Sequence, residues 1–481
     1  MKYKFNIYEK IYAVLLVINA AIICFLGINY LTYGLLVYLV ILRTSKKISN
    51  DNFLLLSLFI PNKYLQLFSI PIYIFLNPSV RKKRLRNTEK LFLAFILTIG
   101  IANCVIYGNM PLGTFFQVGV YYCIFKIIAS FGQVMDHSKT LSILDKMLPV
   151  QLLACIIEFI KSKEFGDSIN GTLISAHYLG VYLIIYIILL IRLRPYKFTS
   201  KEFIIWVIVA AFIIYVADAK HVWAIFVFAF AVAWLLGKLK IKNRISVPIV
   251  VMTIIVVVGT LFIVSPSALS LVSRSDMASI YILNENYNKK VLFFSRTFQE
   301  MLGLNGVFGF GVGQFGSQIS ITLSKGIIYD WDSTLTAYHY ATEPYAKAVG
   351  GLMTEWYTNF GIGISSLVLG YPLVSFIGLF AELGIVGYLW LLRIFDKRFK
   401  NYNPTFIIAF FMLSIFDTYF EIPCVFVLIL IATYANPSKR GLIMGNNRLQ
   451  VIGCKKRIEH KVSRSEEIES VERYPAGGVQ Q

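Results

Sequence analysis

Long apolar runs, separated by short polar stretches, recur through most of the chain. An α-helix needs roughly 20 apolar residues to cross a bilayer. The pattern therefore predicts an all-α polytopic membrane protein. The expected helices cover 11–27, 29–42, 53–60, 64–76, 90–108, 112–130, 141–160, 173–191, 203–218, 221–237, 247–264, 373–392, 405–418 and 421–435.

The number of crossings depends on the short pair of runs around Pro61. If both runs cross, the pattern predicts about 14 transmembrane helices, and if the pair is a re-entrant or interfacial hairpin it predicts about 12. Both counts leave one large loop outside the cytoplasm, and we expect short helices within it.

This loop, residues 265–371, divides the chain. Transmembrane helices fill 1–264 and 372–437, and a polar cytoplasmic tail follows over 438–481. Within the loop, 288–302 carries an apolar stripe at helical spacing. A second pattern, from Tyr345 to Phe360, is typical of a helix lying flat on the membrane surface.

Charge supports this topology. The chain is 57% hydrophobic and 15% charged, with a net charge of +20 carried by Lys and Arg clusters between the apolar runs. Basic loops are retained on the cytoplasmic side, so both termini are predicted to be cytoplasmic and 265–371 to lie outside. This distribution argues against nucleic acid as a partner.

Nothing in the sequence indicates a metal or another cofactor. The six cysteines are scattered singly, without a C-x-x-C pair, and no H-E-x-x-H motif is present. Neither a disulfide framework nor a thiolate metal site is predicted.

Closely spaced glycines stand out in Gly309-Phe310-Gly311-Val312-Gly313-Gln314-Phe315-Gly316. Such a run can bring backbone N–H groups close to phosphates, but no G-K-[ST] follows it. The alternative is a tight turn that joins the preceding helix to the rest of the loop, and this interpretation is favoured because glycine is conformationally permissive.

Arg296 is the leading candidate for chemistry in the loop. A guanidinium presents a fixed fork of donors that matches phosphate, so Arg296 is suited to clamp a diphosphate. The alternative is a surface ion pair with Glu300, four residues further along the same helix.

Further candidates lie near predicted helix ends on the outer face. His177 and His221 could hydrogen-bond a sugar hydroxyl or accept its proton, or they could simply cap helices. Lys220 could meet a lipid phosphate or extend to the headgroups. His339 lies in the loop. Glu382 falls inside a predicted span, where a carboxylate either serves function or joins helices through a hydrogen bond.

Taken in order, these elements resemble the O-antigen and capsular polysaccharide polymerase and O-antigen ligase family of integral membrane glycosyltransferases (Wzy/WaaL-type). The resemblance covers about half of the chain and rests on short motifs. They are Asn170-Gly171-Thr172 with Ala176-His177-Tyr178-Leu179-Gly180, the polar residues Asp218 to His221, Ser295-Arg296 with Gly309-Phe310-Gly311-Val312-Gly313, and Ala381-Glu382-Leu383-Gly384-Ile385-Val386-Gly387.

Two positions depart from the family pattern. Lys220-His221 stands where members commonly have an Arg, and Tyr371-Pro372-Leu373-Val374-Ser375 replaces a stretch in which many members carry a His. If a general base is needed, the role would fall to His339 or His177.

The resemblance implies a metal-independent glycosyltransferase in the bacterial cytoplasmic membrane. It would join repeat units linked to undecaprenyl diphosphate into O-antigen, capsular polysaccharide or exopolysaccharide, with a lipid-linked glycan as both donor and acceptor. A flippase and a chain-length regulator of the same pathway are the implied protein partners. Aromatic residues of the loop offer flat faces to sugar rings, among them Trp331, Tyr338, Tyr340, Tyr345 and Trp356.

Two alternatives remain open at this stage. A ligase would transfer finished glycan onto a lipid core. A flippase or transporter for lipid-linked oligosaccharide, a different class, would need a charged path through the bilayer centre, and only Lys126 and Glu158 lie within or near other spans.

Overall fold

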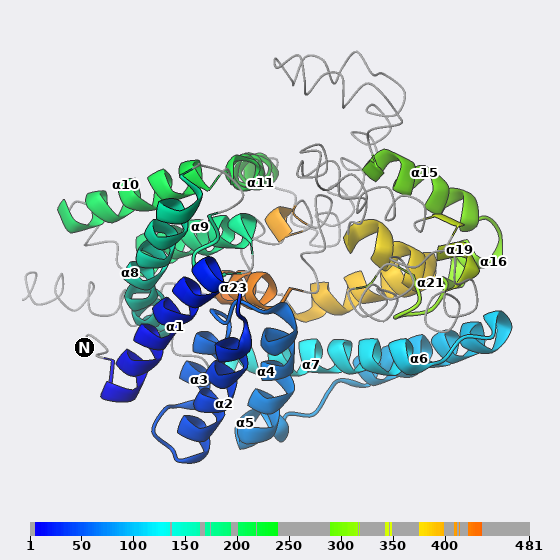
Figure 1. The fold of residues 1–481 in the computed structure, drawn as a ribbon. Coiled ribbons are helices and arrows are strands. Elements are labelled where there is room, and N and C mark those ends of the chain that lie inside the picture. The colour runs from blue at the N-terminus through cyan, green and yellow to red at the C-terminus, as the bar shows by residue number, and fades with distance from the viewer. Residues whose placement is uncertain are drawn as a thin grey trace, which may run out of the picture. The chain divides into compact units, whose positions relative to one another are not determined.

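Part of the chain is described in detail by a computed structural model, drawn in Figure 1. The regular structure in the described residues is helical throughout. The predicted span 247–264, most of the second loop helix and the tail 438–481 lie outside the described residues. Those described are 5–134, 137–163, 169–173, 175–193, 201–217, 219–238, 289–315, 317, 342–345, 347–348, 375–398, 408–410, 413 and 422–434.

The helices follow the predicted apolar runs wherever these are described, and α15 confirms the helix expected over 288–302. They all belong to one compact unit, Met1–Tyr434. Their bounds are α1 Ile7–Leu26, α2 Tyr30–Thr44, α3 Asn50–Ser57, α4 Lys63–Leu76, α5 Pro78–Arg81, α6 Asn87–Tyr107, α7 Leu112–Val134, α8 His137–Ser162, α9 Ala176–Leu193, α10 Lys201–Val216, α11 Lys220–Lys238, α15 Lys289–Glu300, α16 Leu304–Phe308, α19 Glu343–Tyr345, α21 Ser375–Arg398 and α23 Pro423–Tyr434.

Four of the described helices are long and apolar enough to cross a membrane, namely α1, α6, α21 and the Leu112–Ser130 part of α7. Helix α3 has 8 residues, or roughly 12 Å of rise, and is too short to cross alone. Its residues from Asn52 to Ser57 are buried by protein. This geometry agrees with the re-entrant alternative for the pair around Pro61.

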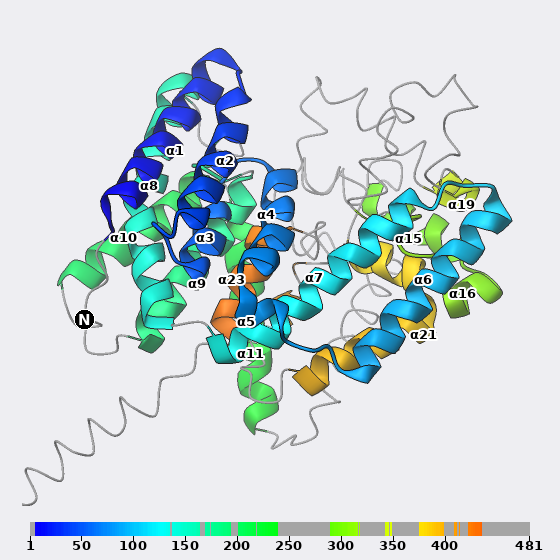
Figure 2. The same ribbon diagram turned by 90° about the horizontal axis from the view of Figure 1, so that it is seen from below.

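Helices α6, α7 and α21 share an aromatic core. The Phe92 ring of α6 lies 6.0 Å from Tyr121 and 5.8 Å from Phe125 of α7, and 5.9 Å from Trp390 of α21, measured between centroids. Edge-on aromatic pairs of this kind contribute about 0.5–1.5 kcal/mol each beyond the area they bury. Figure 2 shows these helices together, with α16 beside α6 and α21.

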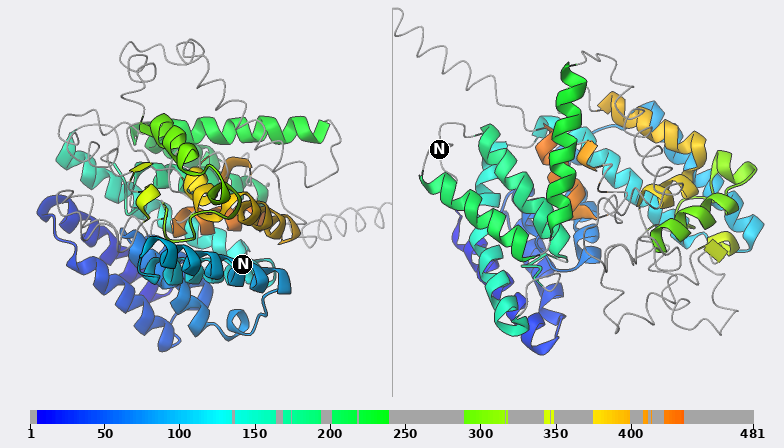
Figure 3. Two further views of the ribbon diagram at one scale, coloured as in Figure 1. Left: turned by 90° about the vertical axis from the view of Figure 1, so that its right-hand side faces the viewer. Right: turned by 90° about the horizontal axis from the view of Figure 1, so that it is seen from above.

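Local sequence sets the bounds of α6. The Glu89 side chain accepts a hydrogen bond from the Arg86 N–H at 2.9 Å at the start of the helix, and Gly108 ends it with a φ of 70°. Helices α1 and α3 pack on α8, and α10, α11 and α23 pack on α9. Helix α23, in orange in Figure 3, also contacts α4 and α7.

Polar contacts join helix ends that the charge pattern assigns to the cytoplasm. Arg398 Nη2 lies 2.7 Å from the Glu89 carboxylate, and Arg86 Nη1 donates to the Lys397 carbonyl at 3.2 Å. Lys126 Nζ donates to the carbonyls of Arg81, at 3.0 Å, and Lys83. The segments predicted to share one face therefore do meet at one end of α6, α7 and α21.

Candidate functional site

Helix α21 is broken at Gly384, where φ is 62° and ψ is 179°. Such a break removes helical partners from carbonyls in the preceding turn. The glycine run supplies replacements, because Phe310 N–H donates to the Ala381 carbonyl at 2.8 Å and Gly311 N–H to the Glu382 carbonyl at 3.1 Å. The loop therefore docks by its backbone onto the interrupted helix.

The Glu382 side chain holds the other end of the same loop. Its exposed fraction is 1%, and its Oε1 atom accepts hydrogen bonds from Phe315 N–H at 2.9 Å and Ser317 N–H at 3.2 Å. At these two amides a carboxylate of the protein itself occupies the position that a bound phosphate would take. The glycine run is thus not an open phosphate loop at these two amides, and it contains a turn in which Gln314 N–H donates to the Gly311 carbonyl at 3.3 Å.

Gly309 and Gly384 cross in direct backbone contact. A Cβ atom built on Gly309, whose φ is +81°, would lie 2.3 Å from the Glu382 carbonyl oxygen. A Cβ atom on Gly384 would lie 2.4 Å from the Gly309 nitrogen. Neither position has room for a side chain, so the loop can dock only because both residues are glycine.

A buried polar network fixes the loop to the turn between α6 and α7. The Thr114 hydroxyl donates to the Val312 carbonyl at 2.9 Å, and Asn109 Nδ2 donates to Gln314 Oε1 at 3.3 Å. Gln314 Nε2 lies 3.4 Å from the Thr114 oxygen, and both side chains are fully buried. Buried hydrogen bonds of this kind favour one arrangement of the two segments.

Aromatic side chains complete the interior of the loop. The rings of Phe310 and Phe315 stack at 4.7 Å, and Phe315 meets Tyr345 edge-on at 5.6 Å. Tyr345 is 3% exposed, so it packs in this interior and does not present a face to a sugar. The other aromatic residues predicted to contact sugars lie outside the described residues.

Arg296 stands on α15, which is fixed to α21. Phe293 and Thr297 are fully buried, and the ring of Phe298 stacks on Phe380 of α21 at 5.8 Å. Arg296 itself is half-buried. Within the described residues no ion pair joins it to Glu300, so the surface-pair interpretation finds no support there.

His177 belongs to a second group of candidates at the start of α9. Glu158 of α8 accepts hydrogen bonds from Asn170 N–H and Gly171 N–H, both at 2.8 Å, and so fixes the loop before α9. His177 N–H donates to the Ser175 hydroxyl oxygen at 3.3 Å. The Glu158 carboxylate thus holds the loop before α9 by two backbone N–H groups, in the same way that the Glu382 carboxylate holds the glycine run.

The N-terminus of α11 lies beside the same part of α9. A Cβ atom on Gly180 would be 2.8 Å from the Ala219 Cβ, which shows how closely α9 packs on the turn before α11. Lys220 and His221 are the first residues of α11, but their side chains lie outside the described residues, as does all of His339.

The candidates thus fall into two groups, Arg296 with Glu382 and His177 with the start of α11. The buried network of Asn109, Thr114 and Gln314 was not predicted from the sequence, although polar residues next to apolar runs are themselves a signal of buried networks.

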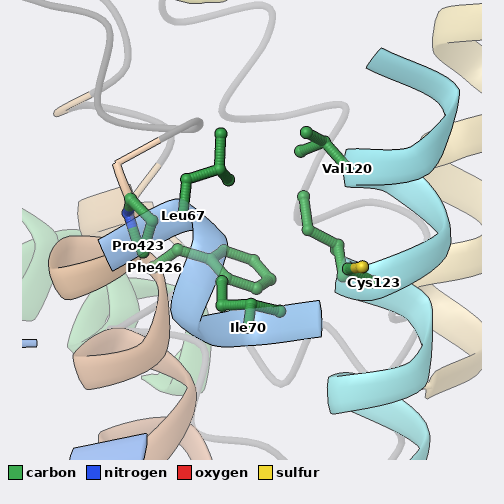
Figure 4. Close-up of a pocket in the computed structure, with 7 residues that line it drawn as sticks. Leu67, Ile70, Val120, Cys123, Pro423 and Phe426 are labelled. Carbon is green, nitrogen blue, oxygen red and sulfur yellow. The ribbon is translucent and has the colours of Figure 1, made fainter. Parts of the chain in front are cut away.

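An apolar recess lies elsewhere, between α4, α7 and α23 (Figure 4). It is uncharged and lined by Leu67, Ile70, Val120, Cys123, Ile124, Pro423 and Phe426. Its lining cannot recognise a phosphate or a sugar. Among the described residues, no three His, Cys, Asp or Glu side chains are grouped so as to hold a metal ion.

Comparison with protein-family models, with curated proteins and with solved structures finds no match for this chain. The class that the structure itself defines is an all-helical protein, over the described residues, with four helices suited to cross a membrane.

Proposed function

We propose that the chain is a polysaccharide repeat-unit polymerase of the bacterial cytoplasmic membrane. In this proposal the shorter apolar helices complete a polytopic bundle, both termini are cytoplasmic, and 265–371 faces outward. The observation that carries the proposal is Arg296, which stands half-buried and without an ion pair to Glu300 on a helix fixed to the broken span α21.

The reaction would join two lipid-linked glycans. The acceptor hydroxyl oxygen forms a bond to the anomeric carbon of the donor, and the bond from that carbon to the lipid diphosphate breaks with its electron pair. Arg296 would stabilise the departing diphosphate, since a guanidinium pairs with phosphate oxygens in a bidentate manner. The proton of the hydroxyl would pass to a base, for which His177, His221 and His339 are the candidates.

Charges elsewhere give little support to a transporter. A translocation path needs ionisable side chains that face a cavity. Lys126 instead donates to backbone carbonyls of Arg81 and Lys83, and Glu158 accepts backbone amides of Asn170 and Gly171. Both charges therefore have structural partners.

Replacement of Arg296 tests the proposal in the native host. Arg296→Ala should lower the polymerisation rate on the order of 10²–10³-fold, the usual cost of losing one donor to a developing negative charge. Single repeats on the lipid carrier should accumulate. Arg296→Lys should recover only part of the rate, because an ammonium lacks the planar fork.

A matched control comes from the same loop. Lys347 is 60% exposed and forms an ion pair with Glu343, so Lys347→Ala removes an equal charge from a surface pair and leaves Arg296 in place. Its polymer should have wild-type length and amount. Long polymer in the Arg296→Ala strain, at equal protein level, would remove the proposed role of Arg296.

Deletion of the gene separates polymerase from ligase. A single repeat attached to the lipid core would indicate a polymerase. Bare core together with finished polymer on undecaprenyl diphosphate would indicate a ligase.

A further inference from the structure

The turn after α15, together with α16, exposes a cluster of apolar side chains. Leu302 and Leu304 have exposed fractions of 78% and 77%, the largest in this part of the chain, and the cluster carries no charge. We name it the α15–α16 wedge, and its members are Leu302, Leu304, Val307 and Phe308. Contiguous exposed apolar surface marks an interaction site.

The wedge continues the apolar face of a candidate membrane span. Asn305, in its middle, places Nδ2 3.4 Å from the hydroxyl oxygen of Tyr107, the last residue of α6. On α6 the neighbouring Val105 and Ile106 are 76% and 72% exposed. Figure 2 shows α16 beside this end of α6.

A second span continues the same surface. A Cβ atom on Gly384 would lie 2.5 Å from the Val307 carbonyl oxygen, so the wedge meets α21 at its break. The next residues of α21, Ile385 and Val386, are 47% and 38% exposed. Apolar surface thus runs from α6 across the wedge to α21.

The wedge lies in an uncharged part of the sequence. No charged residue occurs between Glu300 and Lys325. Helix α15, by contrast, is amphipathic, with Phe293 and Thr297 buried and Gln299 exposed. An apolar tip that follows an amphipathic helix at the end of a span is suited to the headgroup and acyl boundary, where such elements insert about 5–10 Å.

We infer that the α15–α16 wedge inserts into the bilayer and that its occupant is lipid hydrocarbon. The loop 265–371 is then not wholly aqueous, because its first described part returns to the membrane beside α6 and α21. This inference does not depend on the proposed reaction.

Spin labels test the insertion in the full chain in lipid nanodiscs. With the six natural cysteines replaced, a nitroxide is attached at Leu302→Cys or Leu304→Cys, and its collisions with oxygen and with a water-soluble nickel chelate are measured. Ile106→Cys serves as the lipid-facing reference and Gln299→Cys as the water-facing reference. We expect both wedge positions to favour oxygen, as Ile106 does.

Other outcomes would overturn the inference. Nickel accessibility at the wedge equal to that at Gln299 would place it in water, and low accessibility to both reagents would indicate burial against a second copy. If the cysteine-free chain does not fold, Leu302→Trp and Gln299→Trp in the natural chain replace the labels. The chain already holds six Trp residues, so the quenching of each variant by brominated lipid is compared with that of the natural chain. Only Leu302→Trp should add to it, and equal added quenching in both variants would also overturn the inference.

Discussion

Two carboxylates, the buried Glu382 and the half-buried Glu158, act in the same way at the residue scale. Glu382 accepts the N–H groups of Phe315 and Ser317, and Glu158 accepts those of Asn170 and Gly171. A carboxylate can receive several amide hydrogen bonds at once, and such charge-assisted bonds are about twice as strong as neutral ones. Each carboxylate thereby fixes a loop that carries or precedes a candidate site.

Loss of the Glu382 charge should destabilise the chain. Glu382→Gln keeps one oxygen acceptor but removes the charge that strengthens both hydrogen bonds, at an expected cost of about 1–3 kcal/mol. Thermal unfolding of the purified protein in detergent measures the change. Glu343→Gln, at a surface pair whose carboxylate is 55% exposed, should leave the melting temperature nearly unchanged.

The same variant separates two roles for Glu382. A structural role predicts lower stability together with any loss of activity. Full stability with lost polymerisation would instead make Glu382 part of the reaction.

At the element scale, the broken helix and the glycine run form one unit. The break at Gly384 leaves carbonyls that the run satisfies, and the run can approach because Gly309 has no side chain. Helix α15 and its Arg296 are held against the same span through Phe298 and Phe380. The position of Arg296 therefore depends on how the loop docks.

Substitution of Gly309 should undock the loop. Gly309→Ala combines a positive φ of +81° with a contact of 2.3 Å, whereas Gly303→Ala has a similar φ of +86° and nothing within 4 Å. Both variants carry backbone strain of about 1–3 kcal/mol, but only Gly309→Ala also adds a backbone clash. Limited proteolysis should cut the loop faster in Gly309→Ala than in Gly303→Ala. Equal rates would contradict the docking described above.

On the scale of the whole molecule, hydropathy predicted the helices well. The apolar run over 90–108 corresponds to α6, and the apolar stripe over 288–302 corresponds to α15. Both were predictable because the spacing of apolar residues follows directly from burial or contact with lipid. The break at Gly384 gave no such signal, since a glycine inside an apolar run is compatible with a continuous span. Glu382 bonds amides 67 and 65 residues away, and local patterns carry no information about such pairs.

The charge pattern also predicted which helix ends meet. Asn109 and Gln314, both assigned to the outer side, are in contact, as are Glu89 and Arg398, both assigned to the cytoplasm. These contacts establish that the ends share a face. Which face is cytoplasmic remains a prediction of the positive-inside rule.

Thiol labelling on intact cells tests the sidedness. Met110, at the turn after α6, is 50% exposed, and Lys46, at the turn after α2, is also exposed. In a cysteine-free background, an impermeant maleimide should label Met110→Cys on intact cells and Lys46→Cys only after permeabilisation. The reverse pattern would invert the topology and place Arg296 in the cytoplasm.

Reconstitution can establish whether this chain extends lipid-linked glycans, as proposed. The purified protein is placed in proteoliposomes with a synthetic repeat unit on undecaprenyl diphosphate, without nucleotide sugars or added metal. We expect a ladder of longer lipid-linked products from the natural chain, and far less from Arg296→Ala at the same thermal stability. If well-folded protein does not elongate the repeat unit of its own host, the chain is not a polymerase.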